Sequence, residues 1–261
     1  MNEKAFKRRK LHSILFFLLI IGVAFISAYM TDFNLVEGMA TIPTALIWMA
    51  ENLIITTDTL AKLPKILEKL NETIFMSIAA TTIAAAISLF LGIAGSTTTA
   101  VNGFFSTLAR LIASFARNIP VVAWALILLL SFGQNSITGF LALFVGTVGF
   151  LTRAFIESID EAGSSAYEAL TATGATYFQV VGKAIIPQCL PQMISWILFM
   201  IETNIRSATL VGILTGTGIG YAFDLYYKML DYQAVALITL LIVAAVIIIE
   251  LASNHIRRVI L

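Results

Sequence analysis

Two oppositely charged residues lie in an otherwise apolar stretch and are the first candidates for chemistry. Glu202 and Arg206 are four residues apart, so a helix would place them on one face, one turn from each other. An ionisable side chain in mid-bilayer costs about 2.5–3.5 kcal/mol on insertion scales, so it usually faces protein or a water-filled path. A guanidinium binds a tetrahedral oxyanion through paired hydrogen bonds. The pair therefore predicts one of two roles. Either the two charges neutralise each other and fix the packing of the helices, or Arg206 lines a substrate path and Glu202 sets its position.

Two polar residues and a glycine repeat belong to the same region. Asn204 lies roughly 160° round the helix from the charged pair and is expected to face another helix, but it is kept with Ser207 as a candidate for the substrate pathway. Gly216, Gly218 and Gly220 follow. A nucleotide loop is excluded, because no strand precedes these glycines and no lysine follows them directly. They predict non-helical backbone that lines a cavity, either as a gate or as a flexible turn.

The segment 160–187 contains start and stop signals that predict two short helices. A capping box at 165–168 is expected to start the first helix. Gly174 suits the left-handed position that follows a helix. A second box at 176–179 starts the next helix, and Pro187 is expected to close it. A segment that folds into two capped helices has a defined surface to which a partner can bind.

Composition places these residues in a membrane protein. Of 261 residues, 59% are hydrophobic and 12% are charged, against roughly 25% charged in soluble domains. The net charge of +1 gives no reason to expect a nucleic-acid partner. One cysteine cannot form an internal disulfide framework, and two separated histidines cannot make a metal cluster. We therefore expect this chain to bind no cofactor.

Six apolar stretches are expected to cross the membrane. A hydrocarbon core of about 30 Å needs about 20 helical residues. The charge-free run 118–152 is too long for one crossing and has a turn signal at 133–136, so it is divided in two. Arg117 and Pro120 are interpreted as a helix start rather than a binding site. The predicted spans are 11–30, 73–95, 119–132, 137–156, 188–213 and 232–249.

Lysine and arginine placement predicts the orientation. Five of them precede the first span, whose apolar stretch is longer than the roughly 7–15 residues of a signal peptide, so an uncleaved span is expected. With the N-terminus inside, inner segments hold eleven of these cations and outer segments hold four, which favours both termini in the cytoplasm. In the outer stretch 31–72, one apolar helical face predicts an amphipathic interfacial helix; it is formed by Leu60, Leu63, Leu67 and Leu70.

The 160–187 segment resembles the "EAA" loop of permease subunits of bacterial binding-protein-dependent ABC importers. The likeness lies in a Glu-Ala pair, a glycine six positions after the glutamate and a later Ile-Pro pair. Leu170 and Ala184 depart mildly from the family pattern. The resemblance assigns to an ATPase-coupling loop the residues Ala166, Glu168, Ala169, Gly174, Ala175, Ile186 and Pro187.

Three further strings resemble the phosphonate branch of the same family. They are Arg-Asn-Ile-Pro at 117–120, Glu-Thr-Asn-Ile-Arg-Ser-Ala-Thr at 202–209 and Gly-Thr-Gly-Ile-Gly at 216–220. The resemblance runs from about residue 72 to residue 258. The stretch 214–218 is poorer in glycine and alanine than is usual in that branch, which leaves the identity of the substrate open.

The resemblance implies an all-α polytopic fold like that of type I ABC importer permeases, with about six transmembrane helices, an outer amphipathic helix and a cytoplasmic coupling helix pair. It implies one permease domain, 1–261, with an N-terminal part at 1–72 and a core at 73–258. The chain has no G-x-x-x-x-G-K-[ST] loop, so it is not expected to be an enzyme. ATP and Mg would be used by a partner ATPase. The implied partners are a second copy of the chain, two ATPase subunits and an extracytoplasmic binding protein, in the lipid bilayer of a bacterial inner membrane.

The implied cargo is phosphonate or a related phosphorus oxyanion, with phosphate, phosphite or another small solute as alternatives. An ATP-independent secondary transporter or channel usually carries charges in several spans, or inverted repeats. This sequence shows one charged pair in one span and no repeat. The sequence has no H-E-x-x-H motif and no cluster of aspartates or histidines that would support an intramembrane enzyme. A purely structural membrane subunit is the remaining alternative.

Overall fold

The computed structural model describes residues 3–260, and their side chains except those at 3–7, 162 and 164–166. The chain divides into two compact units, Met1–Asn52 (unit 1) and Leu53–Leu261 (unit 2). The described part of each unit is built of helices, which confirms the all-α prediction. The division lies at 52–53 and not near 72, because 63–72 forms the first turns of a long helix of unit 2.

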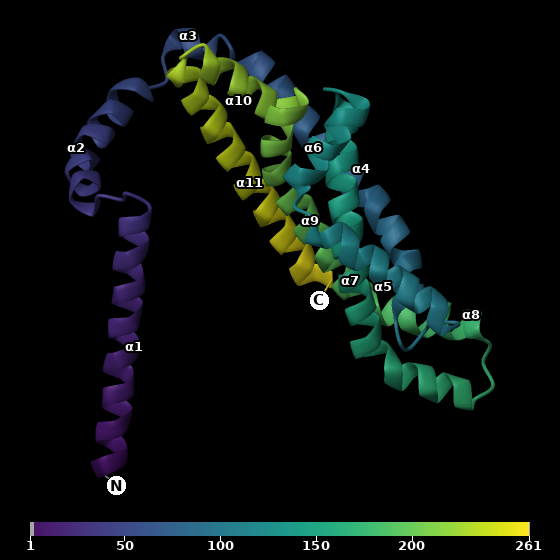
Figure 1. The fold of residues 1–261 in the computed structure, drawn as a ribbon. Coiled ribbons are helices and arrows are strands. Elements are labelled where there is room, and N and C mark those ends of the chain that lie inside the picture. Colours follow the sequence, from purple (N-terminus) through teal and green to yellow (C-terminus); the bar gives the residue numbers. More distant parts are fainter. Residues whose placement is uncertain (1–2, 261) are drawn as a thin grey trace. The chain divides into compact units, whose positions relative to one another are not determined.

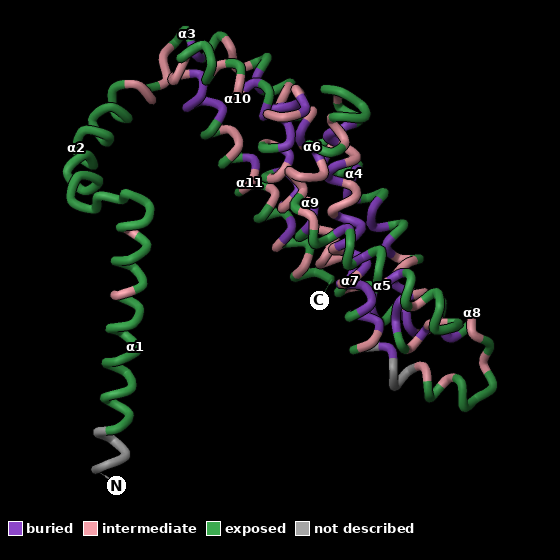
Figure 2. Tube along the Cα trace, viewed as in Figure 1, coloured by how far each residue is buried: buried purple, intermediate pink, exposed green. Residues whose placement is uncertain are grey.

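Unit 1 contains α1 (Glu3–Met30) and α2 (Leu35–Asn52). The stretch Arg8–Met30 is long and apolar enough to cross a membrane, and none of its most apolar window is buried, as the exposed tube of α1 in Figure 2 shows. A helix that is apolar on all sides is suited to a lipid environment. The first predicted span is therefore confirmed as a helix of spanning length.

Unit 2 is a bundle with a short hairpin at one end. Its helices pack mainly through α4, α7 and α9. The turn between α7 and α8 lies at one end of this unit, and α3 and α10 lie at the other end (Figure 1). The elements are α3 (Thr57–Leu60), α4 (Leu63–Gly95), α5 (Gly103–Asn118), α6 (Val121–Phe132), α7 (Ser136–Ala172), α8 (Tyr177–Val180), η1 (Val181–Ile185), α9 (Ile186–Thr215), α10 (Gly218–Lys228) and α11 (Tyr232–Ile260).

Small residues let the long helices of unit 2 approach closely, as is usual where membrane helices pack. A Cβ on Gly92 of α4 would lie 2.9 Å from the Cβ of Phe155 on α7. Such a distance is shorter than real Cβ contacts, so only glycine fits there. The buried face of α4 is accordingly a run of small side chains that includes Thr73, Ser77, Ala80, Thr81, Ala84, Ala85 and Ser88. The four spans predicted at 73–95, 137–156, 188–213 and 232–249 fall within α4, α7, α9 and α11.

The third predicted span is a broken helix. The prediction of one helix over 119–132 is incomplete, because α5 precedes α6 and the two meet at a bend of 92°. At about 1.5 Å per residue, α6 alone covers roughly 18 Å, too little for a crossing. The expected helix start at Pro120 is confirmed, since Pro120 is the N-cap of α6. Within the described residues there are five helices of spanning length, or six if the bent pair is one span.

The helices around the hairpin are longer than predicted. The backbone of α7 is helical without a break from Ser136 to Ala172, so the prediction that the box at 165–168 starts a new helix is wrong. Pro187 does not close a helix either, because it lies in the first turn of α9, directly after the π-helical turn η1. The π-helical turn η1 joins α8 to α9, so α8 and the long α9 form one continuous arm.

The outer stretch is helical, but its boundaries differ from the prediction. Leu63, Leu67 and Leu70 lie in the first turns of α4, and only Leu60 lies in the separate short helix α3. Leu70 is buried, whereas Leu60 and Leu67 are exposed. The 33 residues of α4 cover roughly 50 Å, more than a bilayer core needs. The amphipathic turns are therefore an extension of the second span.

Candidate translocation path and coupling hairpin

Glu202 and Arg206 form an ion pair on α9. Arg206 Nη2 lies 3.0 Å from Glu202 Oε1, as the four-residue spacing predicts. The Glu202 side chain is 11% exposed, whereas the Arg206 side chain is 50% exposed. A guanidinium carries five N–H donors, so an arginine bound through one nitrogen keeps donors for a second anion. The pair is neutral as a whole and still presents a cationic group at the surface.

Asn204 belongs to the packing of the bundle. Its Nδ2 donates to Thr81 Oγ1 on α4 at 2.9 Å and to Thr147 Oγ1 on α7 at 2.7 Å. The residue is 4% exposed. The expectation that Asn204 faces other helices is confirmed, and the structure separates it from the exposed face that carries Arg206. Ser207, the fourth candidate for the pathway, is half-buried.

The glycine repeat forms a tight joint between α9 and α10. Gly216 ends α9 in the left-handed conformation, with φ +70°. Gly218 has φ +58°, and a Cβ there would lie 2.3 Å from Thr73 Oγ1. A Cβ on Gly220 would lie 2.0 Å from the carbonyl oxygen of Thr209. The expectation of non-helical backbone is confirmed for Gly216 and Gly218, whose φ values are positive. It is wrong for Gly220, which is a helical residue of α10. Gly218 and Gly220 are both in close contact with neighbouring elements.

The tip of the predicted coupling loop is an exposed turn. Gly174 has φ +80°, a conformation that favours glycine, and it follows α7 at the predicted position. Glu168 and Ala169 are exposed on the last turns of α7, and Ala175 is half-buried. Across the hairpin, Ile186 is half-buried and Pro187 is exposed. The side chain of Ala166, which was also assigned to this loop, lies outside the described residues.

One face of the hairpin is buried and the opposite face is free. Val180, Val181 and Ile185 pack into the core cluster that contains Ile159 of α7. Beside them, Phe178 is 84% exposed. The buried face holds the hairpin against the bundle, so the exposed aromatic ring is presented on a supported surface. Sequence reasoning missed Phe178, because a single phenylalanine in an apolar chain gives no distinctive signal.

A turn at residues 96–99, between α4 and α5, binds the carboxylate of Asp160. Asp160 Oδ1 accepts hydrogen bonds from Ser96 Oγ at 2.6 Å, from the Thr97 N–H at 2.8 Å and from Thr97 Oγ1 at 2.9 Å. The Thr98 N–H and Oγ1 also lie within 3.3 Å of the same oxygen. Asp160 is on α7, where the hairpin segment begins. The Ser-Thr-Thr-Thr string at 96–99 was the available signal, and the sequence analysis did not use it.

Two further residues, on α5 and α8, are bonded at or next to this turn. Arg110 of α5 donates through Nε to the Gly95 carbonyl oxygen at 2.8 Å, and its Nη2 lies 3.4 Å from Asp160 Oδ2. Tyr177 of α8 donates through its hydroxyl to the Thr99 carbonyl oxygen at 2.8 Å. The 96–99 turn is therefore bonded to both arms of the hairpin, and α5 is bonded to the residue before the turn and to the carboxylate that holds the turn.

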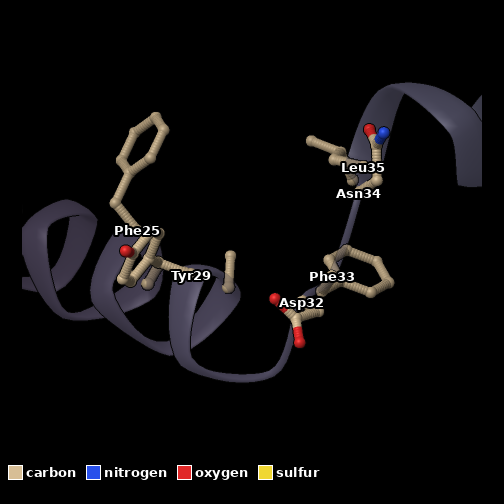
Figure 3. Close-up of a pocket in the computed structure, with 8 residues that line it drawn as sticks. Phe25, Tyr29, Asp32, Phe33, Asn34 and Leu35 are labelled. Carbon is tan, nitrogen blue, oxygen red and sulfur yellow. The ribbon is translucent and has the colours of Figure 1, made fainter.

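Two hollows lie at the surface away from the charged pair. The larger one, about 670 Å³, lies in unit 1, where Figure 3 shows Phe25, Tyr29 and Leu35 around open space at the turn between α1 and α2. The smaller one, about 250 Å³, lies between α4 and α10 and is lined in part by Lys65 and Tyr221. The larger is apolar and open, which is normal for a surface that faces lipid.

Comparison with known proteins identifies the family of this chain. Residues 84–260 match the family described as "Binding-protein-dependent transport system inner membrane component". The chain belongs to this family. It is a permease, and the coupling hairpin, the Glu202–Arg206 pair and the glycine joint all lie inside the matched region.

Two relatives and one solved structure extend the comparison. The chain is 32% identical over 187 residues to the phosphite transport system permease protein PtxC of Stutzerimonas stutzeri, covering 72% of this chain and 68% of the relative. It is 28% identical over 190 residues to the phosphate-import permease protein PhnE of Mycolicibacterium smegmatis, covering 73% of this chain but only 36% of that relative. A chain of the MetNI methionine ABC transporter superposes with a TM-score of 0.67 at 20% identity, covering 75% of this chain and 96% of that one. This likeness shows the fold, which is that of a type I ABC importer permease.

Proposed function

We propose that this chain is the membrane-spanning permease subunit of an ATP-driven importer, which carries phosphonate or a related phosphorus oxyanion across a bacterial inner membrane. The observation that carries the proposal is the hairpin between α7 and α9. It has a buried face that holds it to the bundle and a free face that bears Gly174 and Phe178. A supported, exposed hairpin is suited to binding a separate ATPase subunit, which would use ATP and Mg.

Arg206 supports the choice of an anionic cargo. Its guanidinium is half exposed while Glu202 neutralises it from the buried side. A permanent unpaired cation would bind an oxyanion too tightly for release, whereas a paired arginine binds it more weakly through its remaining donors. The relatives named for phosphite and phosphate transport agree in chemistry with such a contact.

The remaining architecture follows the type I importer fold. One copy supplies one hairpin, so two copies would pair with two ATPase subunits, and an extracytoplasmic binding protein would deliver the solute. The excess of lysine and arginine in the segments on the hairpin side supports a cytoplasmic position for the hairpin and both termini. The glycine joint then lies at the outer end, where it fits a role in outer closure.

The test is reconstitution with the chain's own ATPase subunit and binding protein. Vesicles should take up labelled methylphosphonate, phosphite or phosphate only when ATP is present on the hairpin side, and sulfate should serve as the oxyanion control. Phe178→Ala should reduce copurification of the ATPase subunit, whereas Phe132→Ala, which changes an exposed phenylalanine on α6 away from the hairpin, should not. Uptake by the chain without any ATPase subunit would refute the proposal.

A further inference from the structure

We propose that the 96–99 turn is a second coupling element, and that Asp160 and Tyr177 are the positioning residues that make it follow the hairpin. The proposal rests on the proposed function, because it assumes that an ATPase moves the hairpin. It adds a route by which that movement reaches the broken span formed by α5 and α6.

The first contact comes from the α7 arm. One oxygen of Asp160 faces hydroxyl and backbone donors of Ser96, Thr97 and Thr98, at 2.6–3.3 Å. A carboxylate accepts hydrogen bonds and carries a negative charge, and hydrogen bonds to a charged acceptor are stronger than neutral ones. The turn is therefore held to α7 at the residue where the hairpin segment begins.

The second contact comes from the α8 arm. The Tyr177 hydroxyl donates to the Thr99 carbonyl oxygen at 2.8 Å. Tyr177 directly follows Thr176, whose N–H donates to the Gln179 side chain at 2.9 Å. The two arms of the hairpin therefore hold opposite ends of the same four-residue turn. A displacement of the hairpin cannot leave the turn behind unless these bonds break.

The third contact carries the movement onward. Arg110 of α5 is bonded both to the Gly95 carbonyl oxygen, directly before the turn, and to Asp160, so α5 shares with the turn the carboxylate that holds it. At the far end of α5, Trp124 of α6 donates through Nε1 to the Ala116 carbonyl oxygen at 3.1 Å. A Cβ on Gly149 of α7 would lie 2.5 Å from the Arg117 backbone nitrogen, so the bend is also in backbone contact with α7. The chain of contacts from hairpin to broken span is continuous, which is the physical requirement for coupling.

A purely structural staple would show the same contacts, so the test must measure coupling and not only folding. The assay is the reconstituted importer, and the quantity is the amount of phosphite or methylphosphonate taken up per ATP hydrolysed. Tyr177→Phe removes one hydroxyl and keeps the ring. Asp160→Asn keeps the size and removes the charge. The matched controls are Tyr167→Phe and Glu157→Gln; among the described residues, neither side chain is bonded to the 96–99 turn.

We expect each of the two test variants to lower uptake per ATP by about fivefold or more, the lower end of typical coupling between sites, while both controls keep the wild-type ratio. An unchanged ratio in Tyr177→Phe, with wild-type amounts of assembled importer, would overturn the proposal. If Asp160→Asn fails to assemble, Tyr177→Phe alone decides. Failure of the proposed function is seen separately, because the wild-type chain would then show no ATP-dependent uptake of these oxyanions, or would take them up without any ATPase subunit, whatever the turn variants do.

Discussion

Gly174 allows the docking role of the hairpin to be separated from its folding. The residue has φ +80°, and a Cβ there would meet nothing within 4 Å. A substitution therefore costs only the conformational penalty of the left-handed region, about 1–2 kcal/mol for an ordinary residue, and no steric clash. That penalty is small beside typical folding free energies of about 5–15 kcal/mol, so the variants should insert and fold.

Different side chains at position 174 separate the effect of the backbone conformation on docking from the effect of an added charge. Asn and Asp both tolerate the left-handed region better than Ala, so Gly174→Asn tests the side-chain volume and Gly174→Asp adds a charge at the same position. A penalty of 1–2 kcal/mol borne by the docked state corresponds to an affinity loss of about 5- to 30-fold for Gly174→Ala. We expect a smaller loss for Gly174→Asn and loss of detectable coupling for Gly174→Asp, because an unpaired charge would have to be desolvated in the interface.

The assay is copurification of the ATPase subunit and ATP-dependent uptake, each normalised to the amount of inserted chain. Gly182→Asp is the matched control. It lies in the π-helical turn η1 of the same hairpin, is exposed, does not have a positive φ, and a Cβ there would also meet nothing within 4 Å. Normal ATPase association and uptake in Gly174→Asp would refute the docking role, and equal loss in Gly182→Asp would refute the special importance of residue 174.

Four further predictions address other parts of the site. Arg206→Ala should abolish uptake of a dianion with ATPase association retained, whereas Arg153→Ala, which breaks a similar i,i+4 pair on α7, should leave uptake near normal. Asn204→Leu should lower the unfolding free energy by about 1 kcal/mol, as expected for polar contacts between membrane helices, with little change in uptake; a selective loss of uptake in a stable protein would place Asn204 in the path. Gly220→Ala should lower the melting temperature and the yield of folded protein, because about 1–3 kcal/mol or more is lost on overpacking. Burial opposes ionisation of Asp231, but hydrogen bonds from Lys62 and from the Ala234 N–H, together with the Lys62 charge, lower the pKa of its carboxyl group. The stabilisation from this carboxylate is complete above the unfolded pKa of about 4 and is lost as the pH falls through the folded pKa. Asp231→Asn should therefore flatten the acid side of a plot of melting temperature against pH.

The spans could be predicted because length and hydropathy are local properties of the chain. The same reasoning found the left-handed Gly174 and the opposite directions of Arg206 and Asn204 on α9, since helical spacing alone fixes relative direction. It missed α5, whose two arginines and amphipathic pattern hide it from a search for uniformly apolar stretches. The 92° bend at 119–120 depends on contacts with α7 at Gly149, which no local pattern reports.

The errors around the hairpin have a physical cause as well. The box at 165–168 favours a helix start only where the preceding residues are not already helical, and here α7 arrives from the span with its hydrogen bonds in place. The Asp160 contacts join residues more than sixty positions apart in sequence. A single sequence shows that 96–99 is rich in hydroxyls, but not which carboxylate they surround.

Several ionised groups of the described helical bundle form ion pairs. Arg153 pairs with Glu157, Arg206 with Glu202 and Lys69 with Glu72, while Arg110 shares Asp160 with the turn hydroxyls. Such pairing lowers the cost of keeping charges in a low-dielectric bundle, and it also means that an empty conduit has no strong field to trap an anion. Of these cations, Arg206 combines the most exposed side chain with the most buried partner carboxylate. An oxyanion that approached it would compete with a single buried carboxylate held on the same helix, so contact can form and break without exposing an unpaired charge to lipid.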